Sequence, residues 1–321
     1  YSPLSIPLVL QLNGVYTLWS LPKPVGVGYK QPEWSGNELK NYSLSFQYPL
    51  KNIRMVGELA YSGFKQFSII QSAAASLSKK LDVSYLFRHY SAGYFSPKSN
   101  GLSENSENLN EIGLFLGLGY QMNRRMKLSS YFDYFRFPGP KYQIEASNTS
   151  GWEFLNRLQW EKRHSARGFI QGKWTRKEEK DLIQISLDGH YIAIKSWDFH
   201  VRVMASKLGT EIGYLLLQDI KWDQGKWNVQ GRFAIMNTPS YDTRNYAYEP
   251  GVPYSFSLPA YAGKGIKTTF VMAYQMSRDI SLAAKWARIQ YRDRAEVGSG
   301  LDAIEGNAKT DITLQISYKM H

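Results

Sequence analysis

Residues 111–138, EIGLFLGLGYQMNRRMKLSSYFDYFRFP, alternate between apolar and polar side chains on both sides of a short turn. Leu114 and Leu116 share the apolar parity before the turn, and Phe132 and Tyr134 share it after the turn. Because successive side chains of a β-strand point to opposite faces, this period of two predicts a hairpin with one apolar and one polar face. Each arm has room for the roughly 9–11 residues with which a tilted strand crosses a hydrocarbon layer.

The same alternation recurs along most of the chain. The other segments that show it are LVLQLNGVYTLW at 8–19, NYSLSFQY, IRMVGELAY, LDVSYLFRHY, SGWEFLNRLQWE, ARGFIQGKW, DLIQISLDG, FHVRVMAS, GYLLLQDIKW, WNVQGRFAIM, TTFVMAYQM, ISLAAKWARIQY and DITLQISYKM. With two segments of less regular parity, FSIIQSAAASLS and YIAIKSWDF, they predict about 16 strands, an even number as in single-chain outer-membrane barrels.

The connections between these strands alternate in length. Short turns such as PLKN, SKK, NRR and DQGK take turns with long segments at 92–110, 138–149, 237–265 and 291–308. Short turns on one rim and long outer loops on the other are typical of bacterial outer-membrane barrels. The sequence therefore predicts an all-β fold, an antiparallel transmembrane β-barrel that forms a single domain over residues 1–321. A soluble sandwich would also alternate, but its strands would be shorter and its loop lengths less regular.

Composition agrees with a membrane location. No run approaches the roughly 18 apolar residues of a spanning helix, and the absence of cysteine excludes disulfides and thiolate metal sites. The chain has 23 Tyr, 15 Phe and 9 Trp, and amphipathic rings settle at both membrane interfaces. Two aromatic belts are predicted, with the apolar parity facing lipid and the polar parity facing the lumen. They comprise Tyr120, Trp160, Trp222, Trp227 and Tyr318 at the short-turn rim, and Tyr134, Trp152, Trp174 and Trp286 at the other.

The net charge of +12 makes phosphate-rich partners reasonable. Much of this charge falls in or beside the short turns, at Lys51, Lys79, Lys80, Arg124, Arg125, Lys162, Arg163, Lys195, Lys226 and Arg278. We expect these residues to bind phosphates of outer-membrane lipids, and lipopolysaccharide is a further expected partner. Nucleic acid is the weaker alternative, because the turns lack the interleaved aromatic rings on which single strands stack.

The predicted lumen parity carries charges of both signs, among them Arg88, Glu111, Asp133, Asp219 and Arg232. Charges removed from water need partners, so these rows either cross-link a filled interior or line a wet pore. The pattern alone leaves both possibilities open.

Candidate chemistry is sparse. None of the five histidines has a second ligand at metal-binding helical spacing, so the pattern predicts no metal, cofactor or catalytic residue. His190 and His200 share the lumen parity of adjacent predicted strands, near Asp188 and Asp198. A serine–histidine–carboxylate arrangement there is the less favoured interpretation. Hydrogen-bonded lumen groups are the favoured one, and the chain is predicted to be non-enzymatic.

The last stretch, DITLQISYKMH, alternates to the end of the chain. It resembles the terminal strand signal of outer-membrane proteins, whose last lipid-facing residue is usually aromatic, and this resemblance implies contact with the barrel-assembly machinery during biogenesis. Met320 stands where that aromatic would be, and His321 is an additional residue. The lipid-facing set is Leu314, Ile316, Tyr318 and Met320.

The longest stretch without clean alternation is 237–265, NTPSYDTRNYAYEPGVPYSFSLPAYAGKG. Large rings of low rotamer entropy are enriched in contact surfaces, and prolines lower the cost of ordering a loop. We expect an ordered loop that either plugs the barrel or contacts a partner protein, with the plug favoured because aromatic rings need burial. The candidate residues are Tyr241, Asp242, Arg244, Tyr246, Tyr248, Glu249, Tyr254, Phe256 and Tyr261.

Several segments also resemble a family. They are GVYTLWSLPKP, GELAYSG, YFDYFRFPGPKY, SGWEFLNRLQW, GSGLDAIEGNAKTDITLQISYKM and the 237–265 stretch. Together they resemble the carboxy-terminal barrel portion of Bacteroidota outer-membrane proteins that contain a helix-hairpin-helix segment similar to DNA-uptake competence proteins. The resemblance implies that this segment and further strands precede residue 1, so that the whole barrel has more than 16 strands.

Two functions are consistent with these features. The first is a non-enzymatic barrel that acts as a structural subunit of a larger outer-membrane complex, with other proteins of that assembly as partners. The alternative is a pore for solute or DNA transport across the bacterial outer membrane. Both place the chain in the same membrane and differ in whether the lumen conducts.

Overall fold

The computed structural model describes residues 7–23, 35–63, 66–140, 148–163, 165–194, 196–298 and 300–320. The remaining positions include His164, Lys195, His321 and most of the predicted 138–149 loop, which lie outside the described residues. Within the described residues no helix is long and apolar enough to cross a membrane.

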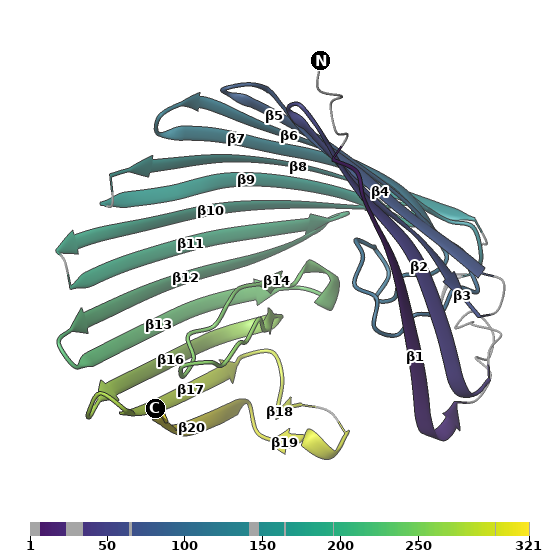
Figure 1. The fold of residues 1–321 in the computed structure, drawn as a ribbon. Coiled ribbons are helices and arrows are strands. Elements are labelled where there is room, and N and C mark those ends of the chain that lie inside the picture. Colours follow the sequence, from purple (N-terminus) through teal and green to yellow (C-terminus); the bar gives the residue numbers. More distant parts are fainter. Residues whose placement is uncertain are drawn as a thin grey trace. The chain divides into compact units, whose positions relative to one another are not determined.

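One antiparallel sheet contains sixteen strands in the order β1 to β13, β16, β17, β20 (Figure 1). Their bounds are β1 Val9–Lys23, β2 Gly36–Leu50, β3 Ile53–Ser62, β4 Gln66–Ser78, β5 Leu81–Tyr90, β6 Glu111–Asn123, β7 Met126–Phe137, β8 Thr149–Lys162, β9 Ala166–Lys177, β10 Lys180–Ile194, β11 Trp197–Leu208, β12 Glu211–Gln224, β13 Trp227–Thr238, β16 Gly263–Gln275, β17 Ile280–Tyr291 and β20 Ala308–Tyr318. The predicted fold class and strand number are confirmed.

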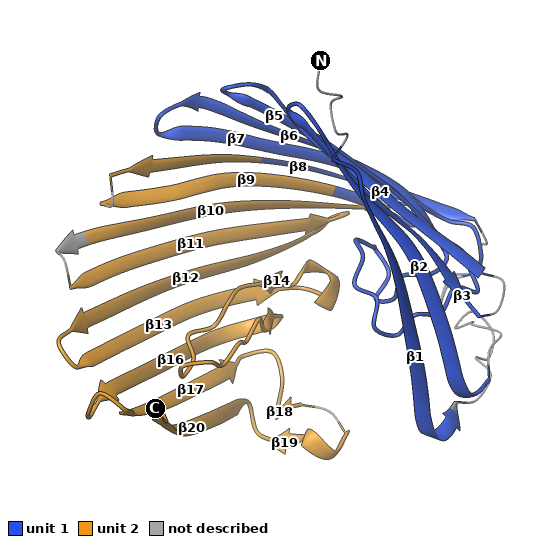
Figure 2. Cartoon of the chain, viewed as in Figure 1, with its two compact units in different colours: residues 1–156, 175–179 blue, residues 157–174, 180–321 orange. Residues whose placement is uncertain are grey.

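The other elements are short and belong to two long connections. The segment between β13 and β16 contains η1 Tyr241–Thr243, β14 Asn245–Tyr246 and β15 Ala260–Tyr261, and the segment between β17 and β20 contains β18 Glu296–Val297, η2 Gly300–Asp302 and β19 Ile304–Glu305. Contacts divide the chain into two compact units, residues 1–156 with 175–179 and residues 157–174 with 180–321 (Figure 2).

The hairpin formed by β6 and β7 shows why this sequence makes a two-faced sheet. Leu116 pairs with Phe132, and its neighbour Gly117 pairs with Tyr131. Leu116 and Phe132 are exposed, whereas Asp133, one residue later, is buried. A shift of one residue in this register would exchange the two faces.

The distribution of polarity is the reverse of that in a soluble protein. Large apolar side chains on one parity of the strands are exposed, and charged side chains on the other parity are among the most buried. We call these the apolar face and the polar face of the sheet. Exposed members of the apolar face include Leu114, Leu116, Leu118, Tyr134, Ile185, Val203, Leu216, Ile235 and Phe270, and buried charged residues of the polar face include Arg88, Glu111, Asp133, Asp188, Asp219 and Arg232.

An apolar surface of this extent is stable against lipid and not against water. The sheet is therefore the wall of an outer-membrane β-barrel, and its apolar face is the lipid-contacting one. The terminal strand follows the same rule, because Leu314, Ile316 and Tyr318 are all exposed and pair with β17 at Ala284, Leu282 and Ile280. Met320 follows the end of β20 and is also exposed.

We predict that Leu116→Arg blocks membrane assembly, because a cation on the lipid face near the bilayer midplane costs about 2–4 kcal/mol. Gly119→Arg is the matched control. Gly119 lies on the polar face opposite Asp82, and a Cβ there would meet no atom closer than 3.8 Å. Heat-modifiable mobility on gels measures assembly, and normal assembly of Leu116→Arg together with failure of Gly119→Arg would mean that the two faces are interchanged.

Candidate functional site

The polar face of the first unit is organised around Arg88 of β5. Its guanidinium donates from Nε to Glu111 Oε1 at 2.6 Å, and from Nη1 and Nη2 to the two carboxylate oxygens of Asp133 at 2.8 and 3.1 Å. Arg88 and Glu111 are fully buried. Gly113 makes room for this cluster, because a Cβ at that position would overlap the guanidinium. The charges that the sequence placed on one parity therefore form a bonded triad.

Glu111 also holds the connection between β5 and β6 against the polar face. Its carboxylate accepts hydrogen bonds from the backbone N–H groups of Glu104 and Asn105 and from the hydroxyl of Ser103. At the other end of the connection, Phe95 packs against Leu39 on the inside of the sheet. The segment at 92–110 is thus fixed to the sheet and is not a free outer loop.

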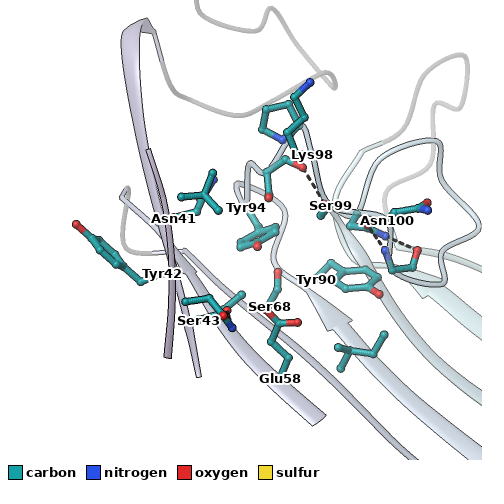
Figure 3. A pocket seen from close by; sticks show the side chains of 18 of the residues that line it. Asn41, Tyr42, Ser43, Glu58, Ser68, Tyr90, Tyr94, Lys98, Ser99 and Asn100 are labelled. Atoms are coloured by element: carbon teal, nitrogen blue, oxygen red, sulfur yellow. Dashed lines mark hydrogen bonds between the residues drawn. The ribbon is translucent and has the colours of Figure 1, made fainter. Parts of the chain in front are cut away.

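A cavity of about 410 Å³ lies between this loop and strands β1 to β5 (Figure 3). Its lining includes Asn13, Asn41, Ser43, Glu58, Ser68, Tyr90, Tyr94 and Lys98. Within the described residues, Asn41 Oδ1 and Ser68 Oγ have no hydrogen-bond partner although both atoms are buried. Polar groups of the lining that are exposed, such as those of Asn13 and Lys98, offer contacts for water or a small polar solute.

We predict that Arg88→Gln releases the 92–110 loop and destabilises the barrel by about 3–5 kcal/mol, because two buried carboxylates lose their counter-ion. Limited proteolysis between residues 92 and 110 and the temperature of the gel mobility shift measure these effects. Arg54→Gln is the matched control, since Arg54 lies two strands away from Arg88, on β3, and is exposed. Equal protease resistance in Arg88→Gln and the control would contradict the anchoring role.

The segment at 237–265 folds over the polar face of the second unit. It contacts β11 and β12 through η1 and β14 (Figure 1). Ala247 and Tyr261 are buried in an apolar cluster on this face, with the wall residues Leu215, Leu217, Ala234 and Met236. An apolar patch on the otherwise polar face is therefore covered by the loop.

Ionic contacts fix the middle of the same loop. Glu249 accepts from Lys267 Nζ at 2.6 Å, from Lys285 Nζ at 3.2 Å and from Thr269 Oγ1 at 3.0 Å. Arg232 of β13 donates to the carbonyl oxygen of Tyr248. Burial by itself raises the pKa of Glu249, but the hydrogen bond from Lys267 and the charges of both lysines lower it below the ordinary value. The folded loop therefore holds Glu249 as a carboxylate.

The aromatic residues of the loop are mostly exposed. Tyr241, Tyr246, Tyr248, Tyr254 and Phe256 are all exposed, Tyr254 to 95% and Phe256 to 76%. The burial that we expected of the aromatic rings is found at Tyr261 alone among the six. The exposed rings form two groups: the guanidinium of Arg244 lies 4.0 Å from the ring of Tyr241 and 5.4 Å from that of Tyr246, and Tyr248 meets Phe256 edge to face at 5.3 Å. Asp242 is exposed beside Arg244.

We predict that Glu249→Gln loosens this loop, because Lys267 and Lys285 lose their shared carboxylate. Wild type should lose the same protection in acid. A folded-state pKa that is lowered contributes stability above the unfolded value of about 4.3, and this contribution disappears as the pH falls through the folded value. Hydrogen exchange of residues 243–250 as a function of pH measures both effects, with Asp242→Asn as the exposed control. Protection that is unaffected by Glu249→Gln would contradict the anchor.

The structure also brings the two predicted lumen histidines together. His190 of β10 and His200 of β11 are directly paired across the strands. His200 contacts Asp219 Oδ2 through Nδ1 and Asp188 Oδ2 through Nε2, both at 2.8 Å. Within the described residues no serine hydroxyl bonds either imidazole, so this geometry does not form a serine–histidine–carboxylate triad.

Comparison with known proteins gives fold-level similarity only. No protein-family model matches the chain, and no curated protein matches it. Among solved structures it is similar to Pseudomonas aeruginosa OccK10 (OpdN), with a TM-score of 0.49 and 10% identity over 97% of this chain and 94% of that one. It is also similar to the siderophore receptor PirA from Acinetobacter baumannii, with a TM-score of 0.49 and 10% identity over 97% of this chain and 58% of that one.

A mutant of the Rh. blastica porin gives a TM-score of 0.41 at 11% identity, over 96% of this chain and 99% of that one. Because all three TM-scores are below 0.5, the assignment as a barrel wall rests on the strand order and the two faces of the sheet.

Proposed function

We propose that this chain is a non-enzymatic outer-membrane barrel that serves as a structural subunit of a larger outer-membrane complex. The observation that carries the proposal is the division of the 237–265 loop into two sides. One side, with Ala247, Glu249 and Tyr261, is fixed to the wall by apolar packing and ion pairs. The other side displays Tyr254 and Phe256 to the surroundings.

A loop that only closed the barrel would not require exposed aromatic rings. Displaying large apolar rings to water forgoes the stabilisation that their burial provides, about 25 cal/mol per Å² of apolar surface. A rigid backbone that presents aromatic and arginine side chains is the usual composition of protein–protein contact sites. The two-sided loop therefore fits a pre-ordered contact with another protein of the same membrane assembly.

The alternative function is a pore for solute or DNA, and one observation favours a path for small polar solutes. The cavity in the first unit is lined by amides, hydroxyls and two charged groups, together with apolar side chains such as Val15 and Ile70, from five neighbouring strands and the 92–110 loop. Accessible polar groups of the lining, such as Asn13 and Lys98, can exchange hydrogen bonds with a passing solute. Such a lining tolerates water, as a conducting lumen must.

The proposal also includes the family to which the chain belongs and its other binding partners. The resemblance of segments such as GVYTLWSLPKP and GELAYSG supports membership in the Bacteroidota helix-hairpin-helix outer-membrane family, with this chain as its carboxy-terminal barrel portion. Exposed Leu314, Ile316 and Tyr318 support recognition by the barrel-assembly machinery. The basic short turns support contact with lipid phosphates, lipopolysaccharide is proposed as an outer-membrane neighbour, and nucleic acid is the less supported partner.

The double variant Tyr254→Ser with Phe256→Ser tests both functions in a single protein, because these two substitutions leave the anchored side of the loop intact. For a structural subunit we expect partners to be lost from mild-detergent purification, with conductance in planar bilayers unchanged. If the exposed rings themselves narrow a pore, we expect the opposite, increased conductance with partners retained. Leu301→Ser, another fully exposed apolar residue in a different long loop, is the control. No change in either measurement would contradict both functions.

A further inference from the structure

We propose that Asp188, His190 and His200 form a binding site for one divalent transition-metal ion on the polar face of the second unit. Asp188 and His190 are two residues apart on β10, so they point to the same face, and His200 lies opposite His190 on β11. One donor atom from each of the three residues lies within 4.8 Å of the other two. Strand pairing thus gathers two imidazoles and a carboxylate that are separated in the sequence.

The spacing of His190 fits a shared ion better than a direct hydrogen bond, whereas His200 Nε2 lies 2.8 Å from Asp188 Oδ2 and exchanges that contact for the ion. His190 Nε2 is 3.7 Å from Asp188 Oδ1, beyond the range of a hydrogen bond. Two ligands on one zinc ion, each at about 2.0–2.2 Å in tetrahedral geometry, stand roughly 3.3–3.6 Å apart. The two imidazole rings are stacked, with centroids 4.0 Å apart and planes inclined by 12°. A small movement of the His190 side chain, which is one-quarter exposed, brings both Nε2 atoms to one ion.

The surroundings supply the outer contacts that metal-binding histidines require. A ligating imidazole ordinarily donates its second N–H to a carboxylate, which fixes the ring orientation. His200 has Asp219 at its Nδ1 at 2.8 Å, and Asp219 is held by Arg232 from Nε at 2.5 Å and from Nη2 at 2.6 Å. Asp198 Oδ1 lies 3.6 Å from His190 Nδ1, beyond hydrogen-bond range, and neither atom has a hydrogen-bond partner within the described residues. One carboxylate therefore bonds His200, and a second lies close enough to bond His190 after a small movement of its side chain.

The charge balance admits a cation. Carboxylates in and around the cluster, counted over the described residues, are Asp188, Asp198, Asp219 and Glu161, against the guanidinium groups of Arg167, Arg202 and Arg232. Arg202 donates to Asp188 Oδ2 at 2.6 Å, which leaves Asp188 Oδ1 for the ion. Neutral imidazoles and one carboxylate oxygen are ligands for Zn²⁺ or Cu²⁺ and not for Ca²⁺, which takes oxygen ligands alone.

Zn²⁺ titration of the refolded full chain in detergent, followed by calorimetry, tests the site. We expect one equivalent to bind to wild type, about tenfold or more weaker binding in His190→Ala, and a roughly tenfold loss in Asp198→Asn, which changes only an outer contact. His190 makes no hydrogen bond within the described residues, so His190→Ala should fold normally, which heat-modifiable mobility verifies. His89→Ala, on β5 of the first unit, is the matched control and should bind as wild type does.

Electron paramagnetic resonance of bound Cu²⁺ provides the second measurement. Coupling to two imidazole nitrogens is expected in wild type, and coupling to one in His190→Ala and in His200→Gln. Equal affinity and equal nitrogen coupling in wild type and His190→Ala would overturn the proposal, and so would the absence of one-equivalent binding to wild type at millimolar Zn²⁺ or Cu²⁺.

Discussion

The requirement that every backbone N–H and C=O group in a membrane find a partner within the protein governs the whole chain. Paired strands meet this requirement, and their period of two then assigns each side chain either to lipid or to the interior. Leu116 and Asp133 lie on adjacent paired strands and have opposite environments for this reason alone. Neighbouring residues in the sequence therefore meet different requirements. One side chain must be apolar to contact lipid, and the next must find partners for its polar or charged groups.

The need to pair buried charged groups explains how the polar face is built. Arg88 in the first unit and Arg232 in the second each bind a carboxylate with two guanidinium nitrogens. An arginine fork fits this task because its donors match the spacing of carboxylate oxygens. Each cluster also reaches a long connection, through Glu111 at 92–110 and through the carbonyl of Tyr248 at 237–265. The ion pairs thus fix loops as well as neutralise charge.

Alternation along the strands predicted the sheet, its strand number and the lipid-facing parity, because these depend on local periodicity. It also placed Arg88, Glu111 and Asp133 on one face. The loops were harder to predict. Nothing in the polar composition of 92–110 indicates that its backbone N–H groups bind a buried glutamate, and burial of the aromatics in 237–265 was expected from ring size alone. Only Tyr261 of the candidate aromatics is buried, together with the small residue Ala247, against Leu215 and Leu217 of the wall.

Cross-strand register explains why the histidine cluster was not predicted as a metal site. Helical ligand spacing is visible in a sequence, whereas His190 and His200 become neighbours only when β10 and β11 pair in one register. Hydrogen bonds extend from His200 to Asp219, from Asp219 to Arg232, and from Arg232 to the carbonyl oxygen of Tyr248 in the loop. A change in charge at His200 alters its hydrogen bond with Asp219, and Asp219 also bonds Arg232. His200 and the contact that Arg232 makes with the loop are therefore linked by one series of hydrogen bonds.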